Sequence, residues 1–154
     1  MTEVTKNTPA GTTVFGMFPV KTVAVIEGRL IEKYRNLADH HSVLLQVDGE
    51  MALVAYAGTD AHGNNKRRPG YIPFPRDRVS AESAGWKHGC LLYIDCDRLA
   101  WVPLAALQIR GRLTLRLLNA VTWRVMKRMP QPVFFNPGND QVVTGARRAI
   151  KAAA

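Results

Sequence analysis

The sequence has few cysteines, no long apolar run and almost no acidic residues toward its C-terminus. Its 154 residues include two cysteines, Cys90 and Cys96, too few for a disulfide framework. Both fall in what reads as a single strand, where a rise of roughly 3.3 Å per residue separates their Cα atoms by about 20 Å. A disulfide needs Cα atoms within about 7 Å. We therefore expect free, buried thiols and a reducing, cytoplasmic compartment.

Long apolar runs are also missing. The longest run, residues 99–107, is interrupted by Pro103, whereas a membrane-spanning helix needs about 20 apolar residues. Residues 1–12 are polar and lack the apolar centre of a signal peptide. The sequence therefore predicts no transmembrane segment.

Acidic residues are nearly absent from the C-terminal part of the chain. Residues 1–97 hold eleven basic and eleven acidic residues, whereas residues 98–154 hold ten basic residues and a single acid, Asp140. The whole formal charge of +9 thus belongs to the second range. Such segregation favours a polyanionic partner, either nucleic acid or an anionic membrane surface. The oligomeric state stays open.

Recognisable catalytic and nucleotide-binding motifs are missing as well. No Gly-rich loop is followed by Lys-Ser/Thr, and no dinucleotide fingerprint occurs. Cys90, Cys96 and His88 lack the spacing of a zinc site. No Ser or Cys nucleophile stands in a recognisable frame with His40 or His41. We expect no cofactor and favour a protein without catalysis, with the question of enzymatic activity left open.

Alternation and turn residues predict strands over most of the chain. We predict them at residues 13–18, 22–26, 42–47, 50–56, 71–74, 90–95 and 133–135, with Asp48-Gly49 as a type I′ turn. Leu30, Tyr34 and Leu37 have helical spacing, which favours a helix over residues 27–37, although a strand through Leu30 is an alternative. Residues 76–88 are polar and predicted to be mostly loop.

The best helix signal covers Leu113–Met129, which Pro130 ends. At 100° per residue, one side holds Leu118, Val121, Thr122, Val125 and Met129, and the opposite arc holds Arg116, Arg124, Lys127 and Arg128. The sequence predicts an α+β fold, a small antiparallel sheet or partly open barrel with one amphipathic basic helix near the C-terminus. We expect a flexible tail (1–12), a single globular domain (13–138) and a basic tail or short helix (139–154).

This helix carries the leading functional hypothesis. Its polar arc has four basic residues and no acid, and a phosphate backbone would relieve their mutual repulsion. Trp123 projects near that arc and could stack on a base. The sequence thus predicts a nucleic-acid-binding module that contacts the backbone of DNA or RNA. The candidate contacts are Arg116, Trp123, Arg124, Lys127 and Arg128 in the helix, Lys66, Arg67 and Arg68 in a long polar loop, and Arg147, Arg148 and Lys151 near the C-terminus.

Two alternatives stay open. A basic domain of this size could be a protein-interaction or inhibitor module that docks on an acidic partner, and an exposed apolar patch would mark it. Asp95 and Asp97, two residues apart in a strand, would face one side about 7 Å apart. They could hold the divalent metal of a nuclease, with the site completed by Asp77 and His88.

Overall fold

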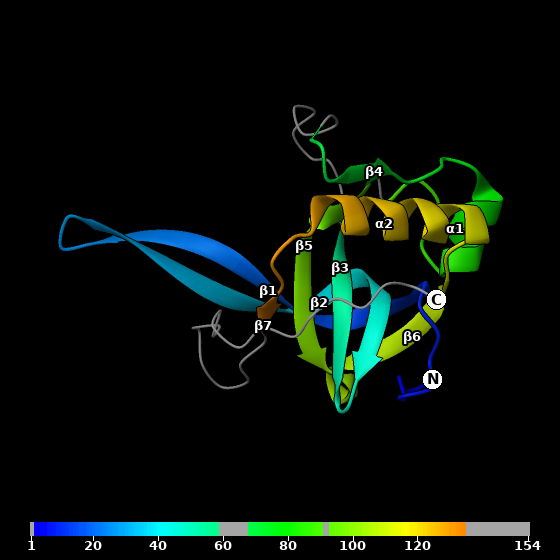
Figure 1. Ribbon diagram of the computed structural model, residues 1–154, viewed down its shortest axis with the longest axis horizontal. Coiled ribbons are helices and arrows are strands. Elements are labelled where there is room, and N and C mark those ends of the chain that lie inside the picture. Colours follow the sequence, from blue (N-terminus) through cyan, green and yellow to red (C-terminus); the bar gives the residue numbers. More distant parts are fainter. Residues whose placement is uncertain (1, 59–67, 91–92, 135–154) are drawn as a thin grey trace.

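In the residues that the structure describes, the protein folds as one mostly antiparallel open sheet with two α-helices (Figure 1). The computed structural model describes residues 2–58, 68–90 and 93–134, with the backbone only for residues 20–26 and 30–39. In chain order the elements are β1 (Thr12–Ile26), β2 (Arg29–Asp48), β3 (Met51–Gly58), β4 (Tyr71–Pro73), α1 (Arg78–Ala84), β5 (Tyr93–Pro103), the 3₁₀ turn η1 (Leu104–Ala106), β6 (Leu107–Arg112), α2 (Leu115–Arg128) and β7 (Val133–Phe134). The predicted α+β class is confirmed.

The seven strands follow the order β4-β5-β3-β2-β1-β6, and β7 pairs with β5 in parallel. Apolar side chains pack on both faces of this sheet. One layer, which includes Leu53, Trp101 and Val121, lies between the sheet and both helices. The other layer, which includes Phe18 and Val54, covers the opposite face. Neither helix in the described part of the chain is long and apolar enough to cross a membrane.

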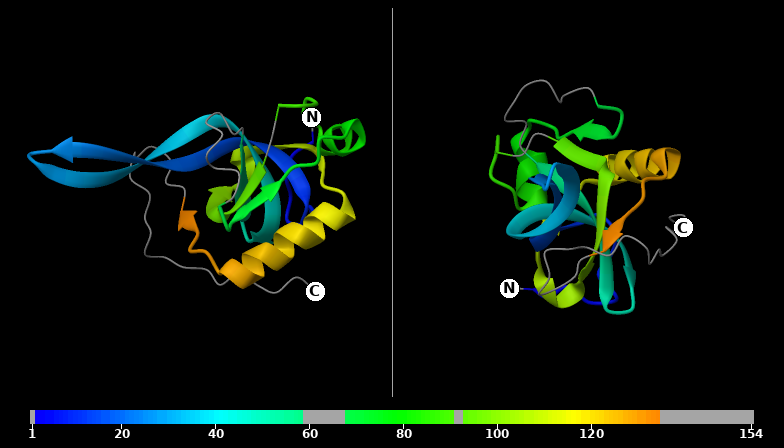
Figure 2. Two further views of the ribbon diagram at one scale, coloured as in Figure 1. Left: turned by 90° about the horizontal axis from the view of Figure 1, so that it is seen from above. Right: turned by 90° about the vertical axis from the view of Figure 1, so that its left-hand side faces the viewer.

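The segment 27–37, where helical spacing favours a helix, belongs instead to a long hairpin. Strand β1 continues to Ile26 and β2 begins at Arg29, and these two residues pair across a two-residue turn. The turn residues Glu27 and Gly28 both have positive φ, 52° and 74°, as a type I′ turn requires. The helix prediction is wrong because cross-strand pairing with β1 outweighs a local pattern. Figures 1 and 2 show this hairpin extending well beyond the rest of the molecule.

The hairpin predicted around Asp48 forms, but its turn lies one residue later than expected. Asp48 pairs with Met51, so the two turn residues are Gly49 and Glu50. Gly49 has a φ of 61°, whereas Glu50 is not among the residues with positive φ. A positive φ at the first turn residue alone fits a type II′ turn rather than type I′.

The N-terminal residues, which we expected to form a flexible tail, pack on the sheet. Val4 is buried in the apolar layer that contains Phe18. Glu3 forms an isolated antiparallel bridge with Gln108 of β6. These contacts place the start of the chain within the folded domain. The predicted C-terminal tail, residues 139–154, lies outside the described residues.

Helix α1 occupies a segment predicted to be loop. The carboxylate of Asp77 accepts hydrogen bonds from the backbone N–H and the hydroxyl of Ser80, both at 2.8 Å, and so caps the helix. These bonds lower the pKa of Asp77. Gly85 ends the helix in the left-handed conformation. Ala81 and Ala84 are buried, so this short helix is held by packing rather than by a long periodic pattern.

Both cysteines are free, but only Cys96 is buried. Cys90 precedes β5 and is exposed, so the expectation of two buried thiols is wrong for this residue. Burial raises the pKa of Cys96 from 9.0 to about 12. The unfolded chain ionises this thiol at the lower value. The stability that its neutral form contributes is therefore complete below pH 9.0 and is lost as the pH rises toward 12.

We expect a thiol reagent at neutral pH to modify one thiol per native chain rapidly and the second only after denaturation. The physical reason is that Cys90 is exposed to the reagent, whereas Cys96 is buried and burial raises its pKa. Mass spectrometry of digested samples would assign the modified residue. Rapid modification of Cys96 in the native protein would contradict this packing.

Candidate nucleic-acid interface

Helix α2 is delimited by two capping residues. The hydroxyl of Thr114 accepts a hydrogen bond from the backbone N–H of Leu117, which marks the N-terminus. At the other end Met129 turns left-handed with a φ of 45°, and its N–H donates to the carbonyl of Val125 at 2.8 Å. Pro130 follows and cannot continue the helix. The helix therefore ends beside β5, where the direction of the chain changes.

Burial sets which side of α2 faces solvent. Leu117, Val121 and Val125 are buried against the sheet. Because successive helical residues are rotated by about 100°, the side of α2 opposite these three residues faces solvent. Trp123 lies on that side with 70% of its surface exposed. Arg116 and Lys127, seven residues before and four residues after it, share this side and are exposed.

The other two basic residues of α2 bind within the molecule. Nε and Nη2 of Arg128 each donate to one carboxylate oxygen of Asp97 at 2.9 Å, a two-point ion pair. Nη1 of Arg124 donates to the backbone carbonyls of Pro69 and, at 3.3 Å, Tyr71. These bonds fasten the second half of α2 to β4 and β5. Of the four basic residues predicted to contact phosphate, Arg116 and Lys127 make no ion pair with any residue that the structure describes.

Asp95 and Asp97, the candidate metal ligands, are each engaged by an arginine. Asp95 is only 5% exposed, and its carboxylate lies 3.8 Å from Nε of Arg98 and accepts the backbone N–H of Asp97 at 3.0 Å. Burial raises the pKa of Asp95. Asp97 is held by Arg128. In the described ranges no three acidic, histidine or cysteine side chains gather into a group that could hold a metal ion.

A break in strand register explains this arrangement. Ala55 of β3 pairs with Leu99 of β5, but the next residue, Tyr56, pairs with Asp95. Three residues of β5 are therefore left out of the pairing, and the regular alternation assumed for Asp95 and Asp97 does not hold there. Nothing in this geometry favours the nuclease hypothesis.

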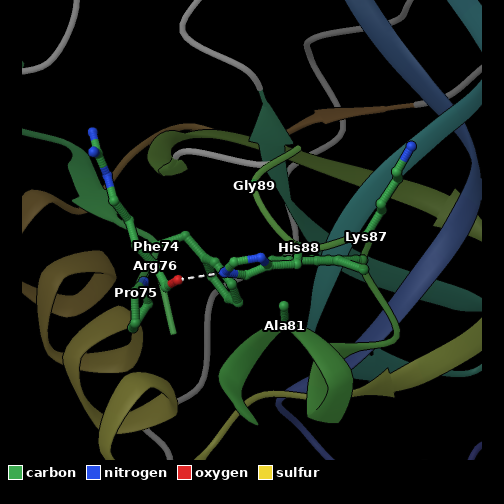
Figure 3. Close-up of a pocket in the computed structure, with 8 residues that line it drawn as sticks. Phe74, Pro75, Arg76, Ala81, Lys87, His88 and Gly89 are labelled. Carbon is green, nitrogen blue, oxygen red and sulfur yellow. Dashed lines mark hydrogen bonds between the residues drawn. The ribbon is translucent and has the colours of Figure 1, made fainter. Parts of the chain in front are cut away.

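Asp77 and His88, proposed above to complete a metal site, lie at α1 instead. Nε2 of His88 is 2.7 Å from the carbonyl oxygen of Arg76. His88 and Arg76, but not Asp77, border a cavity of about 330 Å³ beside Phe74 and Trp86. Figure 3 shows the side chains of Arg76 and Lys87 extending outward on either side of His88. The cavity has an aromatic floor and basic residues on its rim.

Of the remaining predicted contacts, Arg68 is the one that lies within the described residues. Arg68 is exposed, and its guanidinium carbon lies 5.9 Å from the ring centre of Tyr71. The other candidates lie outside the described residues, and they are Lys66, Arg67, Arg147, Arg148 and Lys151.

Comparison with protein-family models, curated proteins and solved structures finds no match. No activity is therefore carried over from another protein, and the function has to be argued from the side chains of this chain.

A row of aromatic rings, which sequence reasoning missed, crosses three strands beside Asp95. Tyr71 of β4 stacks on Tyr93 of β5, with ring centres 4.2 Å apart and planes 8° from parallel. The guanidinium of Arg98 lies 4.6 Å from the ring centre of Tyr56 on β3. Burial raises the pKa of Tyr93. No local pattern could have indicated this row, because it depends on the register of strands that are distant in sequence.

Proposed function

We propose that this chain is a nucleic-acid-binding module without catalysis that contacts phosphate backbone through the outer side of α2. The observation that carries the proposal is the exposure of Trp123 on the same side as Arg116 and Lys127. An indole ring in water offers a stacking surface for an unpaired base. Two cations on the same side supply phosphate contacts, and the helix contains no acidic residue to repel the ligand.

The engaged side chains set the size of this site. Because Arg124 and Arg128 bind Pro69, Tyr71 and Asp97, the helix supplies two cations, rather than four, that no residue in the described ranges engages in an ion pair. Base stacking on an exposed ring favours a single strand over a duplex. The loop and C-terminal candidates, Lys66 to Arg68 and Arg147 to Lys151, remain part of the proposal as further backbone contacts. The two free thiols suit a reducing, cytoplasmic compartment.

Fluorescence anisotropy with labelled single-stranded and duplex oligonucleotides across a salt series tests this proposal. Each phosphate contact on a single strand contributes a slope of roughly 0.7 in log K against log salt. We expect Lys127→Glu to weaken binding about tenfold at low salt and to reduce that slope by about one contact. Trp123→Ala should weaken binding with little change in slope, because stacking is not ionic.

Lys6→Glu is the matched control, because it makes the same charge change at another exposed lysine. Lys6 borders a hollow with Gly49 and Glu50, and Figure 1 places that β2–β3 turn at the opposite end of the molecule from α2. Its affinity should stay within about twofold of the parent protein once the general charge effect is allowed for. Equal losses for Lys6→Glu and Lys127→Glu, or no binding at low salt, would sink the proposal.

A second candidate is a protein-interaction module that docks on an acidic partner through the same helix. It is favoured by the apolar side chains that α2 leaves in solvent, Leu115 at 72% and Met129 at 79% exposure, with Met126 partly exposed. Removing the methionines would weaken a protein complex but leave oligonucleotide affinity unchanged. The Met126→Ala and Met129→Ala double variant therefore separates the two functions.

A further inference from the structure

The cavity beside α1 is bordered by two short segments, residues 74–76 after β4 and residues 86–89 after α1. Its volume of about 330 Å³ is at the lower end of the range for small-molecule sites in proteins. Its base is apolar and includes Ala81 of α1, whereas its rim is basic. Small-molecule sites combine such an apolar lining with a few polar groups that orient the ligand. The lining therefore indicates the chemistry of the ligand.

A Schellman motif at the end of α1 places Trp86 at the base of the cavity. Gly85, in the left-handed conformation, donates its N–H to the carbonyl of Glu82 at 3.1 Å. Trp86 donates its N–H to the carbonyl of Ala81 at 3.0 Å, which turns it back against the helix. Its ring packs on that of Phe74, with ring centres 4.8 Å apart and planes inclined by 57°. Both aromatic residues are more than nine-tenths buried, so the base of the cavity is apolar and held in place by the main chain.

A tight turn carries two of the three basic side chains on the rim. Cys90 donates its N–H to the carbonyl of Lys87 at 3.1 Å, and Gly89 within this turn takes a φ of 82° that other residues rarely adopt. Nε2 of His88 lies 2.7 Å from the carbonyl oxygen of Arg76 and donates a hydrogen bond to it, because a carbonyl can only accept. This bond joins the two segments, so the three basic residues border one cavity.

The rim carries positive charge that the lining does not balance. Arg76 and Lys87 are exposed, and neither forms an ion pair with any residue that the structure describes. In Figure 3 their side chains rise on the same side of the His88 imidazole, one at each flank. None of the described residues that line the cavity is acidic. The carboxylate of the neighbouring Asp77 is occupied by its two hydrogen bonds from Ser80. The rim thus offers two permanent cations and an imidazole to an anion.

Charge and shape together select a phosphate attached to a planar ring. A phosphate monoester carries a charge of about −1.5 to −2 near neutral pH, which two cations and an imidazole match better than the single charge of a carboxylate. Arginine and lysine are both common phosphate ligands. The aromatic base of the cavity favours a flat ring over an inorganic ion. The small volume suits one nucleotide rather than a chain of them.

We propose that this cavity binds a nucleoside monophosphate, with its base against Phe74 and Trp86 and its phosphate between Arg76 and Lys87, beside His88. The site is separate from the outer side of α2, because none of the described residues that line the cavity belongs to that helix. It therefore does not depend on the proposed binding of nucleic acid.

Isothermal titration calorimetry of the full chain with adenosine, guanosine, cytidine and uridine 5′-monophosphates tests this site. We expect at least one of them to bind about tenfold more tightly than either of its fragments, the nucleoside and ribose 5-phosphate, because the ring and the phosphate both contribute. Absence of binding for all of them would overturn the proposal. Equal affinity for either fragment would do the same, since one half of the site would then contribute nothing.

Charge reversal at the rim locates the phosphate. Arg76→Glu and Lys87→Glu should each weaken monophosphate binding roughly tenfold or more, because each removes a hydrogen bond between charged groups. Arg78→Glu is the matched control, since it makes the same change at an exposed arginine of α1 that does not line the cavity. At about 0.15 M ionic strength it should alter affinity less than about threefold, because charges are screened over roughly 8 Å. Circular dichroism melting checks that each variant is folded, and equal losses for all three would contradict the site.

Trp123→Ala separates this cavity from the outer side of α2. It should leave the affinity for nucleoside monophosphates unchanged, because Trp123 does not line the cavity. A loss of monophosphate binding in this variant would place the ligand on α2 and overturn the proposal. Monophosphate binding that persists although oligonucleotides do not bind would support the cavity site and contradict the proposed function alone.

Discussion

Replacing Gly85 with alanine is expected to reduce the free energy of unfolding by about 3 kcal/mol, from positive φ and a steric overlap together. Gly85 ends α1 at a φ of 67°. A Cβ atom built there would lie 2.2 Å from the carbonyl oxygen of Arg110. Because that neighbour is backbone, either α1 or β6 has to move, and α1 carries Ala81 and Ala84 into the core.

Gly49→Ala provides the matched comparison for this prediction. Gly49 has a similar φ of 61°, but a Cβ atom there would meet no atom within 4 Å. Its cost should be the backbone strain alone, about 1 kcal/mol. Urea unfolding followed by circular dichroism gives both values, provided that the m-values agree. Equal losses for the two variants would show that α1 does not pack closely on β6.

Val121→Asp is expected to cost 4 kcal/mol or more, roughly the range that leaves a small domain unfolded. Val121 is fully buried between α2 and the sheet, where a carboxylate would lose its hydration without gaining a partner. Trp123→Asp, two residues later in the same helix, should change stability by about 0.5 kcal/mol or less because that side chain lies in solvent.

Thermal unfolding of the two variants therefore reads out the orientation of α2 directly. A large loss for Trp123→Asp would mean that the proposed binding side is packed against protein. A small loss for Val121→Asp would place the helix the other way round. Either result would remove the observation on which the proposed function rests.

Local signals predicted α2 well because everything that defines it lies within the helix. The apolar period and Pro130 fix its extent, so the predicted range Leu113–Met129 and the observed range Leu115–Arg128 nearly coincide. The predicted division into an apolar and a polar side was wrong at the C-terminal end of the helix. Met129, expected on the apolar side, is exposed because it caps the helix in a left-handed conformation, where 100° steps no longer apply.

Long-range pairing decided what the sequence could not. Residues 27–37 have helical spacing, yet Arg29 to Leu37 pair with Phe18 to Ile26 of the preceding strand. The three residues of β5 that do not pair with β3 likewise depend on the register between these two strands. Asp97 is one of them, and it forms an ion pair with Arg128. Two of the four basic residues predicted to bind a ligand were therefore already engaged, which no count of charges along the chain could reveal.

The three tryptophans of the chain fall into two optical classes. Trp86 and Trp101 are buried in the apolar layer beneath the helices, whereas Trp123 stands in water. Indole emission moves to longer wavelength in a polar surrounding, so the long-wavelength component belongs to the outer side of α2 and the short-wavelength component to the core. A ligand that covers α2 would quench or blue-shift the first without altering the second, and unfolding would shift the second. An unlabelled sample thus distinguishes occupancy from loss of structure in a single spectrum.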